Sequence, residues 1–259
     1  MKKFIALCLV MVMALGLMAG CGNSEKSDMK LVTEGKLIMS TNATFPPYEM
    51  LDDNGNFIGI DVDIAKAIAE KLGLELQIDD MGFTAALEAV QSGSADIVMA
   101  GVTVNEDRKA VMDFSDSYAK GIQAVIVTED SDIKTLDDLE GKKIGTQMGT
   151  TGYIYASDTP ENGGYGEDYV VPFDNGITAV QALKGGQVDC VIIDKGPAEA
   201  YVQANAGLKL LDSAWAEEDY AIGFGKGNTA LKDAVNQALK DLTADGTVQK
   251  IVEKYIAAK

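Results

Sequence analysis

The chain has 259 residues, of which 47% are hydrophobic and 24% are charged, a composition typical of globular proteins. Its formal net charge of −18 argues against nucleic-acid binding, because a polyanion is bound by clustered Lys and Arg. The sequence contains no histidine, the residue most often used as a general base and as a metal ligand. The lack of histidine does not exclude an enzyme, but it favours a protein that is not one, and we expect no catalytic residues, no cofactor and no metal site.

The first segment has the pattern of a targeting signal. Lys2 and Lys3 precede an apolar stretch, residues 4–18, that is too short to span a bilayer comfortably. Small residues then lead to Cys21, and a polar run follows. This pattern resembles bacterial lipoprotein signals, in which the cysteine becomes the lipidated N-terminus, although Met18 stands where leucine is preferred. The resemblance implies a signal peptide over residues 1–21; the alternative is an ordinary secretory signal with an incidental cysteine.

Residues 22–34 are polar and lack periodicity, so we expect a flexible tether there. Apolar runs and helical faces then alternate along the chain. Strands are predicted over residues 37–40, 74–78, 96–99, 143–146 and 188–193, and helices over 60–72 and 83–91. The alternation predicts an α/β fold with mainly parallel sheets and crossover helices. Cys190 lies in the last of these runs and is interpreted as a small buried hydrophobe without a disulfide partner.

Two stretches of the chain echo each other. Residues 90–98 and residues 183–191 each join an apolar helix end to a glycine stop and then to an aspartate that opens a buried strand. The echo predicts two lobes of similar build, with Gly101 and Asp194 just past equivalent strands. Because open α/β sheets bind ligands at the carboxyl ends of their strands, these residues would line one cleft. A chance match between α/β segments is the alternative.

Five segments carry a family resemblance. They are Thr-Asn-Ala-Thr-Phe-Pro-Pro-Tyr-Glu at 41–49, Gly-Ile-Asp-Val-Asp-Ile-Ala-Lys-Ala-Ile at 59–68, Ala-Gly-Val-Thr-Val-Asn-Glu-Asp-Arg-Lys at 100–109, Asp-Phe-Ser-Asp at 113–116 and Gly-Lys-Lys-Ile-Gly-Thr-Gln-Met-Gly-Thr-Thr at 141–151. In this order they resemble the family-3 extracellular solute-binding proteins, the polar-amino-acid-binding proteins of ABC importers. The resemblance covers residues 37–255.

The resemblance implies the two-lobed periplasmic binding protein fold of type II, with two crossover strands as a hinge. Lobe 1 would comprise residues 35–121 together with 215–259, and lobe 2 would comprise residues 122–214. The chain would cross between the lobes near residues 120–124 and again near 218–222, and two such crossings permit closure.

The resemblance also implies the ligand contacts of lobe 1. Arg108 would bind the α-carboxylate of an amino acid through its planar fork of donors. Thr103 and the backbone at Ala100 and Gly101 would add hydrogen bonds, and a glycine allows close approach of the backbone. Taken without the resemblance, Arg108 is better interpreted as a solvated arginine at a helix end in an acidic stretch.

Lobe 2 would supply the opposing contacts. Thr150 and Thr151 open a predicted helix, where free amide groups suit an anion, although simple N-capping is compatible with the same residues. Asp194 would accept the ligand ammonium group, with capping of a helix that starts near Pro197 as the alternative. Gln147 matches a position near the ligand side chain.

Side-chain recognition would fall to residues of the first segment and of the helix that begins at residue 83. Phe45 and Phe83 match an aromatic pair that sandwiches the ligand side chain, because aromatic faces suit both an aliphatic stem and a cation. Core packing is the alternative for both. Asn42 matches a position that reads the side chain, and Tyr48 is either cleft wall or scaffold.

These patterns predict a monomeric, lipid-anchored protein outside the cytoplasmic membrane that captures an amino acid and delivers it to a separate ABC permease. The ligand could be neutral or basic. The alternatives are a ligand-sensing module and a periplasmic dehydratase-like enzyme of the same fold; metal capture would need ligands that the sequence lacks.

Overall fold

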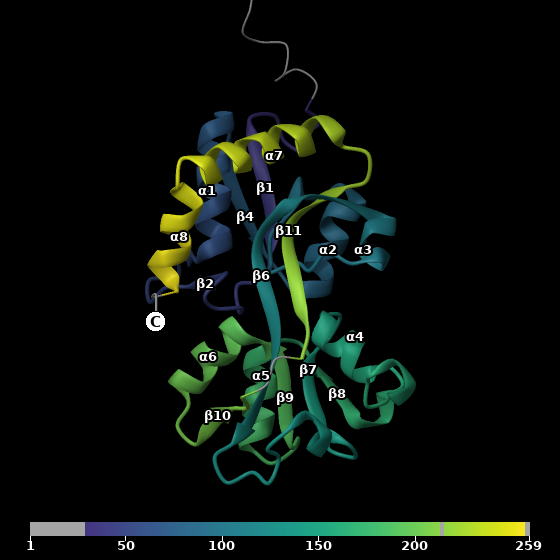
Figure 1. Cartoon of the computed structure of the whole chain (residues 1–259). Coiled ribbons are helices and arrows are strands. Elements are labelled where there is room, and N and C mark those ends of the chain that lie inside the picture. The colour runs from purple at the N-terminus through teal and green to yellow at the C-terminus, as the bar shows by residue number, and fades with distance from the viewer. Residues whose placement is uncertain (1–28, 213–214, 257–259) are drawn as a thin grey trace, which may run out of the picture.

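A computed structural model describes residues 29–212 and 215–256 of the chain, and these residues form two lobes joined by long strands (Figure 1). The predicted signal peptide and Cys21 lie outside the described residues. Within the described part of the chain, no helix is long and apolar enough to cross a membrane.

The first lobe is built around a parallel three-stranded unit. Its elements are β1 (Lys36–Thr41), α1 (Ile60–Leu72), β4 (Glu75–Asp80), α2 (Phe83–Ser92) and β5 (Ile97–Val98). β1 lies between β4 and β5 and pairs in parallel with both. α1 forms because Ile60, Ile64 and Ile68 recur on one face, and all three are fully buried. It ends at Gly73, whose left-handed backbone closes the last turn.

The second lobe repeats this plan. Its elements are β7 (Ile144–Gln147), α4 (Thr151–Ser157), β8 (Val170–Phe173), α5 (Gly176–Lys184), β9 (Cys190–Asp194), α6 (Lys195–Ala204) and β10 (Leu208–Leu210), with short 3-10 helices at Leu136–Leu139, Pro160–Asn162 and Glu167–Tyr169. β7 lies between β8 and β9 and pairs in parallel with both. The strand orders β4-β1-β5 and β8-β7-β9 are therefore equivalent, as the sequence echo predicted.

Two long strands connect the lobes. β6 (Met112–Thr128) and β11 (Glu217–Gly225) run antiparallel, and their pairing spans the middle of the molecule (Figure 1). β11 also pairs with β5 of the first lobe, and β6 also pairs with β9 and β10 of the second. The two crossover segments predicted from the sequence lie within these strands. The predicted fold class is thus confirmed.

The remaining elements complete the first lobe. They are the hairpin β2 (Met50–Leu51) and β3 (Phe57–Ile58), and the helices α3 (Glu106–Val111), α7 (Thr229–Ala244) and α8 (Thr247–Tyr255). The chain thus returns to the first lobe after β11, and α7 and α8 pack beside α1 (Figure 1).

The lobe boundaries chosen from the sequence remain a prediction, but two contacts bear on them. Met29 and Leu31 at the end of the predicted tether pack against the hydrophobic core, and the Val32 amide donates to Asp96 Oδ1 at 2.8 Å. Trp215 lies at the predicted start of the returning tail, yet its ring contacts Tyr155 and Tyr165 of the second lobe.

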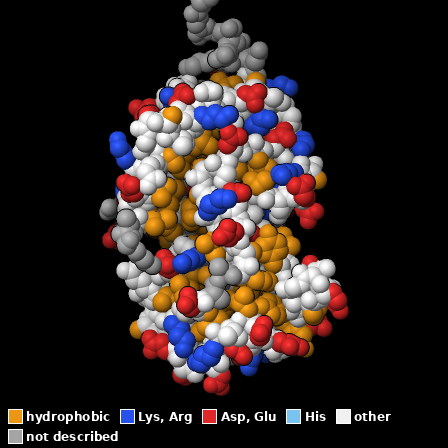
Figure 2. Space-filling view, viewed as in Figure 1, with side chains coloured by type: hydrophobic (Ala, Val, Ile, Leu, Met, Phe, Trp, Pro, Cys, Tyr) orange, Lys and Arg blue, Asp and Glu red, His pale blue; other side chains and the backbone are white. Residues whose placement is uncertain are grey.

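The surface carries both signs of charge. On the face seen in Figure 2, Lys and Arg side chains alternate with Asp and Glu over both lobes. This face presents no continuous basic surface of the kind that binds nucleic acid.

Candidate ligand-binding site

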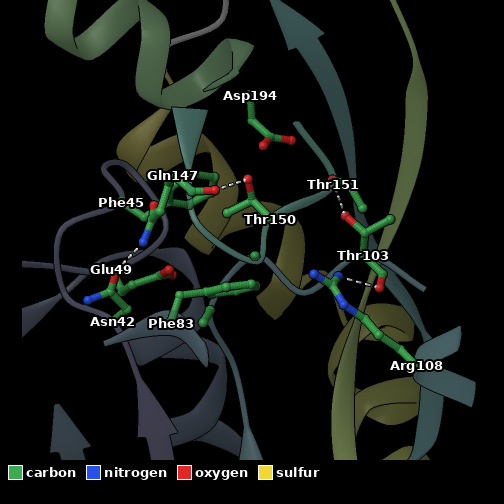
Figure 3. Close-up of a pocket in the computed structure, with 12 residues that line it drawn as sticks. Asn42, Phe45, Glu49, Phe83, Thr103, Arg108, Gln147, Thr150, Thr151 and Asp194 are labelled. Atoms are coloured by element: carbon green, nitrogen blue, oxygen red, sulfur yellow. Dashed lines mark hydrogen bonds between the residues drawn. The ribbon is translucent and has the colours of Figure 1, made fainter. Parts of the chain in front are cut away.

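A narrow pocket lies between the two lobes, with about 320 Å³ of empty space that includes the part open to solvent. It is lined by Asn42, Phe45, Glu49, Phe83, Ala100, Gly101, Thr103 and Arg108 from the first lobe and by Gln147, Thr150, Thr151 and Asp194 from the second (Figure 3). The structure therefore brings all eleven predicted ligand-contact residues to one pocket, together with Glu49, which the sequence analysis did not select. Their roles in binding remain a prediction.

Arg108 is positioned by the start of α3. The side chain of Asn105 caps this helix and accepts the Arg108 amide at 2.8 Å. The guanidinium group donates to the Thr103 carbonyl at 2.8 Å and, across the cleft, to the Gly149 carbonyl at 3.2 Å. It lies 5.4 Å from the ring centre of Phe83. Arg108 is the only buried basic residue in the described part of the chain.

Asp194 faces the pocket from the end of β9. One carboxylate oxygen accepts from the Tyr220 hydroxyl, and the other accepts from Gln123 Nε2 at 3.0 Å. Although Asp194 precedes α6, its side chain makes no capping hydrogen bond, so the capping alternative is not supported. Burial, and then the nearby Glu218 carboxylate, raises the pKa of Asp194 to about 7. A cation placed beside Asp194 would stabilise its charged form.

The threonines combine the two roles considered for them. Thr150 caps α4 through its hydroxyl, which accepts the Tyr153 amide at 3.3 Å, and Thr150 also lines the pocket. Thr151 is almost fully buried, and its hydroxyl lies 3.5 Å from that of Thr103 on the other lobe. The capping and ligand-contact interpretations are therefore compatible.

Several hydrogen bonds join the lobes directly. Gln147 Nε2 donates to Asn42 Oδ1 at 2.9 Å, and the Tyr201 hydroxyl donates to the Thr44 carbonyl at 2.5 Å. With the Arg108 to Gly149 contact, these bonds hold the cleft in a closed arrangement. The side chains of Asn42 and Arg108 approach the pocket from opposite sides (Figure 3).

The backbone of Gly101 approaches the aromatic wall of the pocket closely. Gly101 adopts φ of 55°, and a Cβ there would lie 2.7 Å from the ring of Phe45. Its amide donates to the buried Asp61 at 3.0 Å. Phe45 and Phe83 are both nearly buried, so the alternative of core packing describes part of their environment, but each presents a surface to the pocket.

Glu49 is the unexpected member of the site. It is fully buried and forms no ion pair with a described residue; its carboxyl group hydrogen-bonds to the neighbouring carboxyl group of Asp61. Burial raises the pKa of Glu49 well above its usual range, and the nearby Asp61 raises it further. The backbone of Glu49 bonds back to Phe45 across the Pro46-Pro47 turn, which brings the two side chains to the same pocket. Such a turn, closed by an acid, is the signal that could have identified it.

The buried carboxyl groups predict how stability depends on pH in the absence of ligand. The pKa of Asp61 is raised to about 6 by burial, and that of Asp194 to about 7, whereas unfolded aspartates titrate near 3.9. Between about pH 4 and pH 7 the folded protein binds more protons than the unfolded chain, so stability falls as pH rises. The expected slope is about 1.4 kcal/mol per pH unit for each such group. Urea unfolding at several pH values measures it.

A matched control isolates the cause of this slope. Asp61→Asn removes one titrating group and keeps an oxygen that can accept from Gly101. The slope of its stability against pH should therefore be smaller by the contribution of one carboxyl group. An unchanged profile would show that Asp61 does not contribute to the slope.

The pocket between the two lobes contains a buried guanidinium group and buried carboxyl groups. Such a pocket is suited to bind a small ligand that carries both charges, so the fold and the site define a solute-binding protein. Residues 37–258 match the bacterial extracellular solute-binding proteins, family 3, and the chain belongs to that family. Its relatives are amino-acid-binding proteins of ABC transporters, and the chain is an amino-acid-binding protein of this kind.

Relatives and solved structures agree with this assignment. The chain is 34% identical to the arginine-binding extracellular protein ArtP of Bacillus subtilis, with 100% of both chains covered. It is 32% identical to the L-cystine-binding protein TcyJ of Escherichia coli, over 95% of this chain and 94% of that one. An ancestral arginine-binding protein bound to arginine has a TM-score of 0.81 and 42% identity, over 88% of this chain and 100% of that one.

Proposed function

We propose that the protein captures an amino acid with a cationic side chain, of the arginine type, and delivers it to an ABC importer. The observation that carries this specificity is Glu49, a buried carboxyl group that lines the pocket next to Asp61 and forms no ion pair with a described residue.

The charges of the pocket support a cationic side chain. A zwitterionic α-amino acid would pair its carboxylate with Arg108 and its ammonium group with Asp194. A neutral side chain would then leave Glu49 either buried as an unpaired charge, which is costly, or protonated. A guanidinium or ammonium group beside Glu49 offers the missing partner, and the faces of Phe45 and Phe83 suit such a cation. The arginine-binding relatives agree with this choice.

Binding would stabilise the closed cleft. Arg108 belongs to the first lobe and Asp194 to the second, so one ligand can contact both only when the lobes meet. A ligand that interacts better with the closed arrangement shifts the population toward it. β6 and β11 are the natural hinge, since they are the strands shared by both lobes. The permease would then recognise the closed form.

Glu49→Gln tests the proposed specificity. The substitution keeps the shape of the side chain and removes its charge. We expect the affinity for arginine to fall about 30-fold or more, because a buried charge pair is lost. The affinity for glutamine should change by less than about threefold, since a neutral side chain does not need the charge. Titration calorimetry of wild type and of Glu49→Gln, each with arginine and with glutamine, measures the change in affinity for each ligand. A parallel loss for arginine and glutamine would refute the cationic preference.

We propose that the protein acts by binding alone. The charged groups of the pocket are all assigned to parts of an amino acid, and none of them is left to transfer a proton to a reacting atom. Release of a changed product from a purified sample incubated with arginine would revive the enzymatic alternative.

We also propose that the mature protein is a monomer anchored to the membrane through lipid on Cys21. The small residues before this cysteine support the anchor. Cys21→Ser should prevent incorporation of radiolabelled fatty acid and release the protein from the membrane fraction into the soluble one, while binding of arginine stays unchanged. Retention of label in this variant would contradict the proposal.

A further inference from the structure

Gln123 lies behind the pocket at the centre of the interlobe strands. It is fully buried on β6 and does not line the pocket itself. Its Cα is the pairing partner of Asp194 on β9, so the two side chains are cross-strand neighbours. On the other edge of β6, Gly121 pairs with Glu218 of β11. Gly121 and Gln123 share one face of the strand, and a Cβ at Gly121 would lie 2.6 Å from the ring of Tyr220, whose hydroxyl donates to Asp194.

The side-chain amide of Gln123 joins these two carboxylates. Nε2 donates to Asp194 Oδ2 at 3.0 Å and to Glu218 Oε2 at 2.8 Å, and it lies 3.5 Å from the hydroxyl of Thr151. Both of its hydrogens are therefore used by carboxylates. Glu218 is itself buried, and the Tyr155 hydroxyl of α4 lies beside it.

The orientation of this amide follows from its surroundings. Oε1 lies on the side of Gly152, where a Cβ would approach it to 2.8 Å. The opposite orientation would place the oxygen between two carboxylates and leave the NH₂ group without an acceptor, so the assigned orientation is the favourable one.

The side-chain amide of Gln123 lies between two carboxylates that repel each other. Glu218 repels the charged form of Asp194, which is already disfavoured by burial. A neutral donor between the two carboxylates offsets this repulsion and fixes the Asp194 oxygen that Tyr220 does not hold. Because Gln123 and Glu218 are on the two interlobe strands, the position of Asp194 is tied to the geometry of the hinge.

We propose that Gln123 is a positioning residue that couples the interlobe strands to recognition of the ligand α-ammonium group, by holding Asp194 beside Glu218 in a charged and aligned state. This role rests on the proposed function, since it requires that Asp194 receives the ammonium group of the bound amino acid. This positioning role distinguishes Gln123 from a residue that only fills space in the hinge.

A pair of ligands tests this role. Arginine carries the α-ammonium group, whereas 5-guanidinopentanoic acid is the same molecule without it. Gln123→Ala should lower the affinity for arginine about 10- to 100-fold, since hydrogen bonds to a charged group are lost. The affinity for 5-guanidinopentanoic acid, measured by displacement titration, should change by less than about threefold. An equal loss for both ligands, or no loss for arginine, would overturn the proposal.

Gln123→Glu provides a second measurement that does not depend on tolerance of a cavity. The new carboxyl group fits the same space, but it has one hydrogen to donate when protonated and none when ionised, so it can hold at most one of Asp194 and Glu218. The groups around it are Asp194 on β9, Glu218 and Tyr220 on β11, Tyr155 on α4 and Arg108 on α3. We expect arginine affinity of this variant, relative to wild type, to fall steadily between pH 5.5 and pH 8. A ratio independent of pH would overturn the proposal.

The ligand preference of the wild-type protein tests the proposed function separately from the role of Gln123. If wild type does not bind arginine but binds another amino acid, the cationic specificity is wrong. The same comparison then uses that amino acid and its analogue without the ammonium group, and a selective loss for the amino acid still supports the role of Gln123.

Discussion

Arg108→Ala is expected to lower the affinity for every α-amino acid by about 100-fold or more. The guanidinium group is the only buried cation among the described residues, and it bonds to both sides of the cleft, to Thr103 and to Gly149. Its removal would leave the ligand carboxylate buried without a charged partner, and breaking a buried ion pair costs about 3–5 kcal/mol. Titration calorimetry with arginine and with glutamine measures the loss.

Arg108→Lys is the matched control for this prediction. Lysine keeps the charge but not the two-donor fork, so it should recover only part of the affinity. Thermal unfolding of the ligand-free variants must accompany the titrations, because Arg108 also joins the lobes through its bond to Gly149. Amino-acid binding by a folded Arg108→Ala variant within tenfold of wild type would remove this residue from the carboxylate site.

Asp194→Asn should have an effect of similar size, about 100-fold, through the opposite end of the ligand. Asparagine has nearly the same shape, so the loss would come from the missing charge opposite the ammonium group. In the ligand-free protein the same change should maintain or raise stability at pH 8. The raised pKa of Asp194, which results from burial and Glu218, means that its charged form is disfavoured there.

Opposite effects on affinity and stability would separate a ligand-binding carboxylate from a structural one. Titration with arginine and urea unfolding at pH 8, both on the same preparation, give the two quantities. If Asp194→Asn lowered stability and left the affinity unchanged, Asp194 would be part of the scaffold and not of the ammonium site.

Much of the fold followed from local patterns in the sequence. The four-residue spacing of Ile60, Ile64 and Ile68 predicted α1, and Gly73 marked its end, because a helical face and a left-handed cap are local properties. The echo between residues 90–98 and 183–191 predicted two lobes of one plan. Their equivalent strand orders confirm it, and the structure places Gly101 and Asp194 in the same pocket.

The lining of the pocket was also largely predictable, but through family motifs and not through local physics. Arg108 in isolation has the pattern of an exposed arginine at a helix end, and only the surrounding segment indicates a ligand contact. The structure gives the physical basis, since Asn105 caps α3 and turns the guanidinium group into the cleft.

Glu49 and Gln123 show where sequence reasoning ended. The local turn from Phe45 to Glu49 places Glu49 in the pocket, whereas its proximity to Asp194 and the surroundings of Gln123 depend on segments far apart in the chain. Glu49 is buried near Asp61 and Asp194, and Gln123 faces Asp194 and Glu218, which are 71 and 95 residues away. A strand residue such as Gln123 gives no sign in the sequence of which neighbours it will have, because strand pairing is not local.

A crystal structure of the mature protein, refolded to remove carried-over ligand and crystallised with arginine, would show how the ligand lies in the pocket. We expect the α-carboxylate on Arg108, the α-ammonium group on Asp194 and the guanidinium group beside Glu49, between Phe45 and Phe83. An arginine bound in the opposite direction would contradict the proposed ligand contacts. A cleft that holds no arginine in crystals grown at a saturating arginine concentration would contradict them as well.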